Sequence, residues 1–195
     1  MLTSLGKPAA PSDAVDLLLE CHQRIRSFLG LARRLGEARA EPAAAVADAA
    51  AGVRRYFTMA LPLHALDEEE TIAPRLRGRD PAAEAELATM TREHREHQGP
   101  LSVLVEACAQ LTRDPGRHGE LAAVVRGAAD ELTRHFAAHL AREEEVIFPA
   151  LRRLLDAATD AVIVKEIRLR RGVVAGQGGL EATAGGRSAA APDLR

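Results

Sequence analysis

The chain has 195 residues, of which 47 % are hydrophobic and only 3 % aromatic, and its 26 basic and 28 acidic residues give a net charge of −2. This length suits one domain with a buried core. The apolar residues are mostly Ala, Leu and Val and there is no Trp, which favours helices over sheet. The near-neutral charge balance argues against nucleic acid or an anionic membrane as a partner.

The cysteines and the apolar stretches bear on where the protein works. Cys21 and Cys108 are too few for a disulfide framework, and we expect both thiols to be reduced and buried. The N-terminal stretch has one Lys and no apolar core of signal-peptide length. No stretch approaches the roughly 20 apolar residues of a membrane span. A cytoplasmic location without membrane association is therefore expected.

Apolar residues recur at helical spacing along the first half of the chain. Residues 12–13 can cap a first helix, which should end around residues 36–40. Pro42 suits the start of a second helix, which should kink near Pro62 and stop near Pro74. Two helices joined by a short connection are therefore predicted here.

The second half of the chain has the same organisation. The Asp-Pro pair at 80–81 opens a third helix, and the Gly-Pro pair at 99–100 should bend it. The Asp-Pro pair at 114–115 marks a turn, and a fourth helix should run from about residue 120 to residue 148. The chain thus predicts two consecutive helical hairpins.

These patterns predict an all-α protein with four regions. A flexible N-terminus (1–11) precedes a four-helix bundle (12–155), which is followed by an accessory basic helix (156–171) and a disordered Gly- and Ala-rich tail (172–195). A basic run of this kind is more often a solvated face than a docking surface for a protein partner. The basic residues of the accessory helix are Lys165, Arg168, Arg170 and Arg171.

An internal repeat relates the two hairpins. Residues 64–76 and 139–151 share the pattern His-x-x-x-Glu-Glu-Glu-x-Ile-x-Pro-x-Leu at an offset of 75, and His22 and His94 precede them at an offset of 72. Neither hairpin can bury its apolar stripe alone, so the duplication predicts an up-down-up-down bundle with a pseudo-twofold axis.

The repeated residues are a candidate ligand set for two metal ions. A His and a Glu four residues apart project from the same face of a helix. One such pair alone is usually a solvated surface pair, and one His on an apolar stripe is usually a core residue. Four such residues facing inward on four helices are harder to explain without metal. Buried imidazoles without a partner would together destabilise the fold by several kcal/mol, and a metal ion supplies that partner. The candidate ligands are His22, His64, Glu68, His94, His139 and Glu143.

On these motifs the chain resembles the hemerythrin-like family, also called the HHE cation-binding domain, over roughly residues 15–154. The resemblance implies an up-down four-helix bundle that holds two non-haem iron ions joined by an oxo or hydroxo bridge. It also implies that the six candidate residues are the ligands, with Glu68 and Glu143 as bridging carboxylates.

The residue chemistry agrees with such a centre. Imidazole and carboxylate together favour iron, manganese or zinc over the all-oxygen sites of magnesium or calcium. The resemblance implies iron, with zinc or manganese less expected. Four imidazoles and two bridging carboxylates supply about eight donors, and an oxo or hydroxo bridge brings the total to about ten. Two octahedral ions require twelve, so about two positions remain for a small ligand.

The sequence departs from the oxygen-carrying members in two places. Gln98 stands where their fifth His lies, one turn after His94, and His97 could take that role or lie beside the centre. Those proteins also place their fourth-helix carboxylate five residues after the His, at Glu144 here; an α-helix turns such a residue by about 140°, so Glu143 is preferred. His135 has no His counterpart in the first half and is expected to act near the centre rather than in it.

Three functions remain open. The first is binding of O2, NO or peroxide by a di-iron protein for sensing, buffering or carriage. The second is a di-iron enzyme that reduces peroxide or nitric oxide or assists iron repair, and the third is a metal-stabilised regulatory module whose protein partner is unknown. A ferritin-like oxidase is disfavoured, because none of the seven His has a Glu three residues before it.

Overall fold

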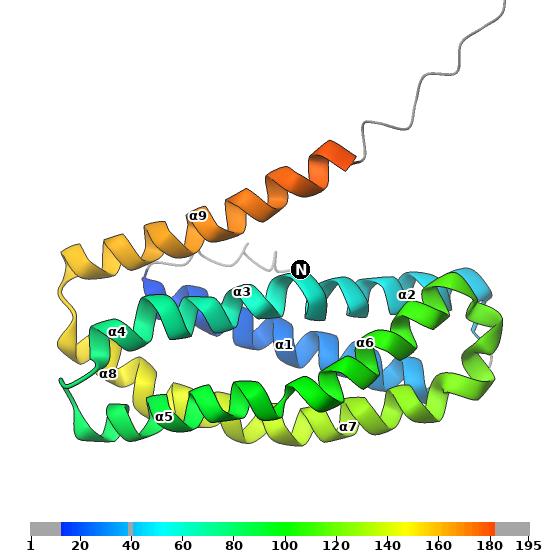
Figure 1. Cartoon of the computed structure of the whole chain (residues 1–195), viewed down its shortest axis with the longest axis horizontal. Coiled ribbons are helices and arrows are strands. Elements are labelled where there is room, and N and C mark those ends of the chain that lie inside the picture. Colours follow the sequence, from blue (N-terminus) through cyan, green and yellow to red (C-terminus); the bar gives the residue numbers. More distant parts are fainter. Residues whose placement is uncertain (1–12, 39–40, 182–195) are drawn as a thin grey trace, which may run out of the picture.

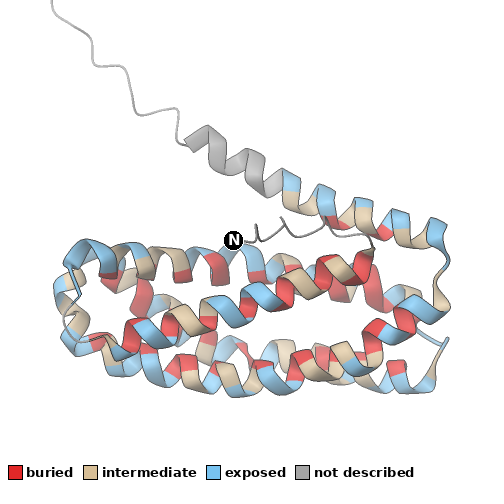
Figure 2. Cartoon of the chain, turned by 180° about the vertical axis from the view of Figure 1, so that it is seen from behind, coloured by how far each residue is buried: buried red, intermediate tan, exposed pale blue. Residues whose placement is uncertain are grey.

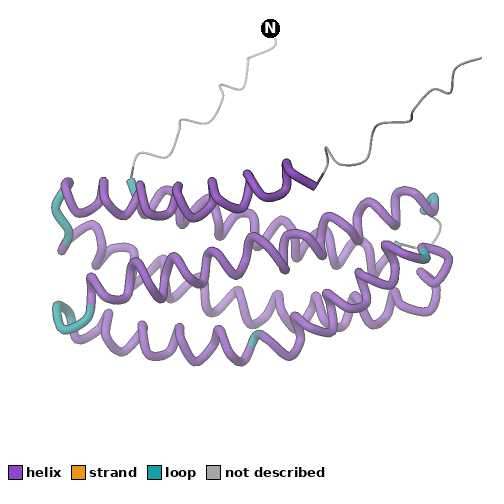
Figure 3. The backbone as a smooth tube through the Cα atoms, turned by 45° about the horizontal axis from the view of Figure 1, so that its top comes forward, coloured by secondary structure: helices purple, strands orange, loops and turns teal. Residues whose placement is uncertain are grey.

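The computed structural model describes residues 13–38 and 41–181, and every regular element in these ranges is a helix. Four long antiparallel helical segments form a bundle, and a further helix crosses its outside (Figure 1). Short connections at the ends of the bundle join the segments (Figure 3). The predicted all-α bundle is confirmed. Within the described residues, no helix is long and apolar enough to cross a membrane.

The first bundle helix is regular, whereas the other three are composite. The first is α1 (Ala14–Glu37), capped by Asp13, whose side chain accepts a hydrogen bond from the Asp16 N–H. The second consists of α2 (Ala43–Arg55), η1 (Tyr56–Ala60), α3 (Leu61–Leu66), η2 (Asp67–Ile72) and α4 (Ala73–Leu76). The third consists of α5 (Pro81–Glu96) and α6 (Gln98–Arg113), and the fourth of η3 (Pro115–Arg117), α7 (His118–Arg142), η4 (Glu143–Ile147) and α8 (Phe148–Leu154).

The elements η1, η2 and η4 are π-helical turns, and each has the same cause. A proline follows at the second position of the next helix and has no N–H for the carbonyl four residues before it. The N–H of the residue before each proline bonds instead to the carbonyl five residues back. These pairs are Leu61 to Tyr56, Ala73 to Glu68 and Phe148 to Glu143. The trailing proline of the repeated motif therefore places a wide turn at each motif's first glutamate.

Buried residues lie along all four segments of the bundle (Figure 2). The core consists of two apolar clusters with a polar layer between them. One cluster joins the second half of α1 to α2, α6 and α7, and includes the fully buried Leu104 and Leu132. The other joins the start of α1 to α4, α5, α8 and α9, and includes the fully buried Ile72 and Leu76. Between the clusters lies the buried His22, near the middle of α1, so the polar layer is enclosed at both ends by apolar side chains.

The accessory helix, α9 (Ala157–Glu181), packs against the bundle end that contains the chain's first described residues (Figure 1). Its Ile163 and Ile167 are fully buried there, and Asp160 accepts a hydrogen bond from the Ala14 N–H. The boundary expected at residue 171 is corrected, because the helix continues to Glu181. Glycine destabilises a helix interior by only about 1 kcal/mol relative to alanine, which does not forbid helix here. The expected flexible residues 1–11 and the remainder of the expected disordered tail, 182–195, lie outside the described residues.

Candidate metal centre

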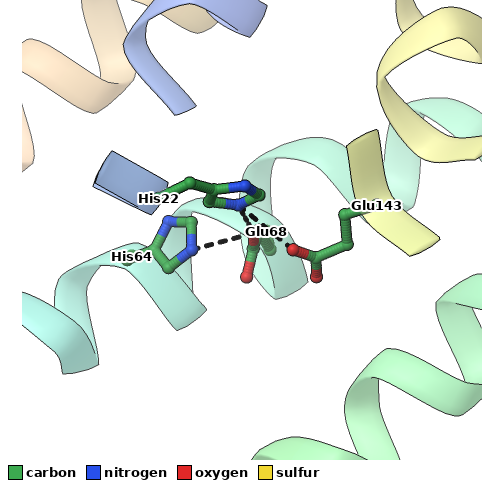
Figure 4. A group of neighbouring side chains, drawn as sticks. All are labelled: His22, His64, Glu68 and Glu143. Carbon is green, nitrogen blue, oxygen red and sulfur yellow. Dashed lines mark ion pairs between the residues drawn. The ribbon is translucent and has the colours of Figure 1, made fainter. Parts of the chain in front are cut away.

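The structure brings all six sequence-predicted ligands together in the polar layer. They form two overlapping groups, each with two imidazoles, and both groups contain the same two glutamates. Five of the six are buried, and His94 is 11 % exposed. The first group, which Figure 4 shows, is His22, His64, Glu68 and Glu143; the second is His94, His139, Glu68 and Glu143.

Each glutamate carboxylate lies between imidazoles of the two groups. Glu68 Oε1 is 3.2 Å from His64 Nε2, and its Oε2 is 3.3 Å from His94 Nε2. The other carboxylate is arranged in the same way: Glu143 Oε1 is 3.2 Å from His139 Nε2, and its Oε2 is 3.2 Å from His22 Nε2. Each carboxylate thus offers one oxygen to each group, which is the arrangement of a bridge between two ions.

The hydrogen-bond inventory tests whether these residues fit a pair of ions. Eight buried nitrogen and oxygen atoms of this cluster, including all four carboxylate oxygens, have no hydrogen-bond partner. Leaving such groups unpaired costs about 1–3 kcal/mol each. Two ligands at right angles on an ion, with bonds of about 2.1 Å, are separated by about 3.0 Å, close to the observed N···O distances. The donor set therefore fits two first-row transition-metal ions.

Outer carboxylates orient two of the imidazoles across the repeat. Glu144, from the second motif, accepts a hydrogen bond from His22 Nδ1 in α1 at 2.7 Å. Glu69, from the first motif, pairs with His94 Nδ1 in α5, also at 2.7 Å. A carboxylate on Nδ1 keeps the opposite nitrogen, Nε2, directed inward and raises its basicity as a ligand. The second glutamate of each motif therefore orients a candidate ligand of the opposite hairpin.

The other two candidate imidazoles, His64 and His139, differ in the partner of their Nδ1 atom, so the two halves of the repeat are not equivalent here. Glu93 accepts a hydrogen bond from His139 Nδ1 at 2.9 Å and also pairs with Arg142. His64 is the counterpart of His139, yet its Nδ1 is buried and has no partner. At the offset of 72 the counterpart of Glu93 is Cys21, which has no carboxylate. Sequence reasoning missed the role of Glu93, whose only signal was its place directly before His94.

Burial and nearby carboxylates shift the pKa values of three of the candidate imidazoles in the absence of metal. Burial alone lowers the pKa of His22, but the contacts of its Nε2 with the Glu143 and Glu68 carboxylates together raise it to about 10. The pKa of His94 is raised to about 9 in the same way, mainly by contact with the Glu68 carboxylate. Burial lowers the pKa of His64 to about 3, because Glu68 compensates only in part. Two imidazolium ions thus face two carboxylates.

His97 and His135 lie beside the centre. His97 is buried at the turn between α5 and α6 and is not in either ligand group. Its ring contacts that of His139, packs on Phe136 and stacks on His135 at 5.7 Å between centroids. Gln98, which stands in place of the fifth histidine, is exposed and donates its amide to the His94 carbonyl. His97 is therefore a neighbour of the candidate ligand His139, and His135 contacts His97.

Ion pairs connect α9 to the residue directly before a candidate ligand. The carboxylate of Asp67, the residue before Glu68, is fully buried and pairs with Arg170 and Arg171. Arg171 also donates to the Cys21 sulfur at 3.0 Å. Burial raises the pKa of the Cys21 thiol, opposed in part by the Arg171 guanidinium. Sequence reasoning noticed these arginines but not the buried Asp67, which reads as a surface residue within an acidic run.

A cleft of about 590 Å³ opens onto the centre between the second and third bundle helices. His64, His94, His97 and His139 line it. Its apolar lining includes four buried side chains, namely Phe57, Leu61, Leu101 and Phe136. The candidate ligands can therefore be reached from outside through this cleft.

The bundle and its internal His/Glu cluster define a metal-binding four-helix protein. The family model described as the hemerythrin HHE cation-binding domain matches residues 13–151, with a second, overlapping match at 101–168. The chain belongs to this family, as its motifs predicted. A search of curated proteins found no match to the sequence.

Proposed function

We propose that this protein holds two non-haem iron ions and binds O2 or another small ligand, NO or peroxide, for sensing, buffering or carriage. One observation carries the proposal: two ligand groups share both buried glutamates, so each carboxylate can bridge two ions. The cytoplasm is the proposed location, supported by two buried cysteines, Cys21 and Cys108, that are free thiols.

Membership of this family and the proposed reaction with small oxidants favour iron over the alternatives. Two imidazoles and two carboxylate oxygens per ion leave coordination positions for ligands that come from solution, and a pair of iron ions supplies the redox chemistry that small oxidants require. The protein's own part is to hold the imidazoles by Glu144, Glu69 and Glu93 and to enclose the centre between apolar clusters. Zinc or manganese would accept the same donors, so metal identity needs measurement.

The test is to load the protein with ferrous iron without air and then admit O2. We expect two iron ions per chain and visible charge-transfer absorption of an oxidised di-iron centre after exposure. His64→Ala and His139→Ala should each sharply lower the bound iron. His118→Ala is the matched control, because His118 lies at the far end of α7 and bonds to the Leu35 carbonyl. A colourless, unreactive product, or equal iron in all variants, would contradict the proposal.

A second candidate is an enzyme that reduces peroxide or nitric oxide, or that assists iron repair. The cleft favours it, because four histidines at or beside the centre line an opening much larger than a diatomic molecule. Steady-state consumption of peroxide or nitric oxide with a reductant would support this function. Binding without turnover would leave the first proposal in place.

A third candidate is a metal-controlled interaction module. It is favoured by the contact of Arg170 and Arg171 with Asp67, directly before Glu68, through which metal binding could alter how α9 packs. Limited proteolysis of α9 with and without metal tests it. Equal cleavage rates in the two states would count against this function.

A further inference from the structure

The cleft above the candidate ligands is larger than a diatomic ligand requires. It encloses about 590 Å³, whereas one water molecule takes about 30 Å³ in the liquid. Its volume falls in the range of roughly 300–1,000 Å³ that is typical of sites for small organic molecules. O2 or NO alone would fill only a small part of the opening.

The inner walls suit a hydrocarbon. Phe57, Leu61, Leu101 and Phe136 are buried residues from three of the bundle helices, and all four line the cleft. At about 25 cal/mol per Å² of apolar surface removed from water, an alkyl chain of a few carbons would gain appreciable binding free energy there. We therefore expect the part of the bound molecule that lies nearest the histidines to be apolar.

The rim supplies one charge. Arg95 lines the cleft and is exposed, and its guanidinium forms no hydrogen bond or ion pair with any residue that the structure describes. Arg92, three residues earlier on the same helix, is paired with Glu96 instead. The cleft's one lining carboxylate, Glu69, is engaged with His94. The unpaired guanidinium thus gives the mouth of the cleft a preference for an anion.

We propose that the cleft binds a small amphipathic carboxylate, such as a medium-chain monocarboxylate, with its carboxylate on Arg95 and its hydrocarbon chain along the buried walls. The inference deepens the proposed function, since a chain placed over the histidine floor would cover the route to the centre. The bound molecule would then lie beside the centre with its hydrocarbon chain nearest the histidines, and it would slow the entry of small ligands.

The experiment is calorimetric titration of the iron-loaded full chain, kept without air, with octanoate, 1-octanol and octylammonium. We expect one octanoate per chain, and octylammonium to bind at least about tenfold more weakly. Arg95→Gln should weaken octanoate binding about tenfold or more, as expected for loss of a charge-assisted hydrogen bond, while leaving octanol unchanged. Arg92→Gln is the matched control and should bind octanoate like the parent. Ser102→Trp, a bulky change at an exposed position of the rim, should weaken all three.

The outcomes separate the carboxylate site from the metal function. No octanoate binding, equal loss in Arg95→Gln and Arg92→Gln, or equal affinity for octylammonium would overturn the inference. Tighter binding of octanol than of octanoate would refute the anionic part and assign the cleft to neutral apolar molecules. Iron content and the absorption change with O2 are recorded on the same samples. Octanoate binding in protein that lacks the visible bands would uphold the cleft site and refute the di-iron function.

Discussion

Metal binding should release protons from the centre, because two of the candidate ligands, His22 and His94, carry protons when no ion is bound. In the metal-free protein His22 has a pKa of about 10 and His94 a pKa of about 9, so both are imidazolium at pH 7. A metal ligand must be the neutral imidazole. His22 belongs to one ligand group and His94 to the other. Each ion should therefore displace one proton.

The magnitude follows from the distance between each pKa and the working pH. Removing a proton at pH 7 opposes metal binding by about 4 kcal/mol at His22 and about 3 kcal/mol at His94, since one pKa unit corresponds to about 1.4 kcal/mol. The affinity for each ion should rise about tenfold per pH unit between pH 7 and pH 8. Both pKa values lie above the ordinary 6.5. The protons therefore stabilise the metal-free fold fully below about pH 6.5, and that stability is lost as the pH rises through 9 and 10.

The assay is proton release in weakly buffered solution at pH 7, measured with an indicator as ferrous iron is added without air. The wild-type chain should release about two protons per two ions bound. His22→Gln should release about one, because only His94 remains to be deprotonated. His118→Ala should behave as the wild type. Release of no protons, or an affinity independent of pH between 7 and 8, would refute the assignment of these two imidazoles as protonated, metal-displaced groups.

Three further predictions concern the surroundings of the centre. Glu144→Gln should weaken metal affinity about 10- to 100-fold in a competition assay with a chelator, because it loosens the orientation of its imidazole; the exposed Glu145→Gln should have little effect, and equal losses would contradict this. Of the four candidate imidazoles only His64 lacks a partner on Nδ1, so the ion in its ligand group should be held more weakly. A chelator should therefore remove the ions in two phases of one ion each, and a single phase would show that the two groups hold metal alike. Gly36→Ala should lower the free energy of unfolding by about 1–3 kcal/mol in a denaturant titration, because the added Cβ would lie 2.7 Å from the Arg126 backbone; Gly127→Ala, whose Cβ would meet nothing within 4 Å, should be neutral or stabilising.

The sequence alone was sufficient to predict the bundle and to name the six residues that the structure brings together. The apolar spacing that predicts a helix is a local property, and so is the projection of His64 and Glu68 from one face. The repeat added a long-range constraint, because two hairpins with the same inward residues must close on each other to bury them. The glutamate four residues after each His could be preferred over the next one from helix geometry alone.

Other features depended on contacts that no local pattern encodes. Glu144 and His22 are 122 residues apart in the chain, and their hydrogen bond exists only because the two hairpins meet. Asp67 lies in an acidic run that looks solvated, but it is buried because α9 brings Arg170 to it. Likewise the break at His97 shows in the sequence as Gly-Pro, whereas the burial of that ring depends on packing against Phe136. Side-chain spacing along one helix therefore determined which groups face inward. Only the packing of helices against one another decided which of them pair, which remain without a partner, and where a cleft stays open.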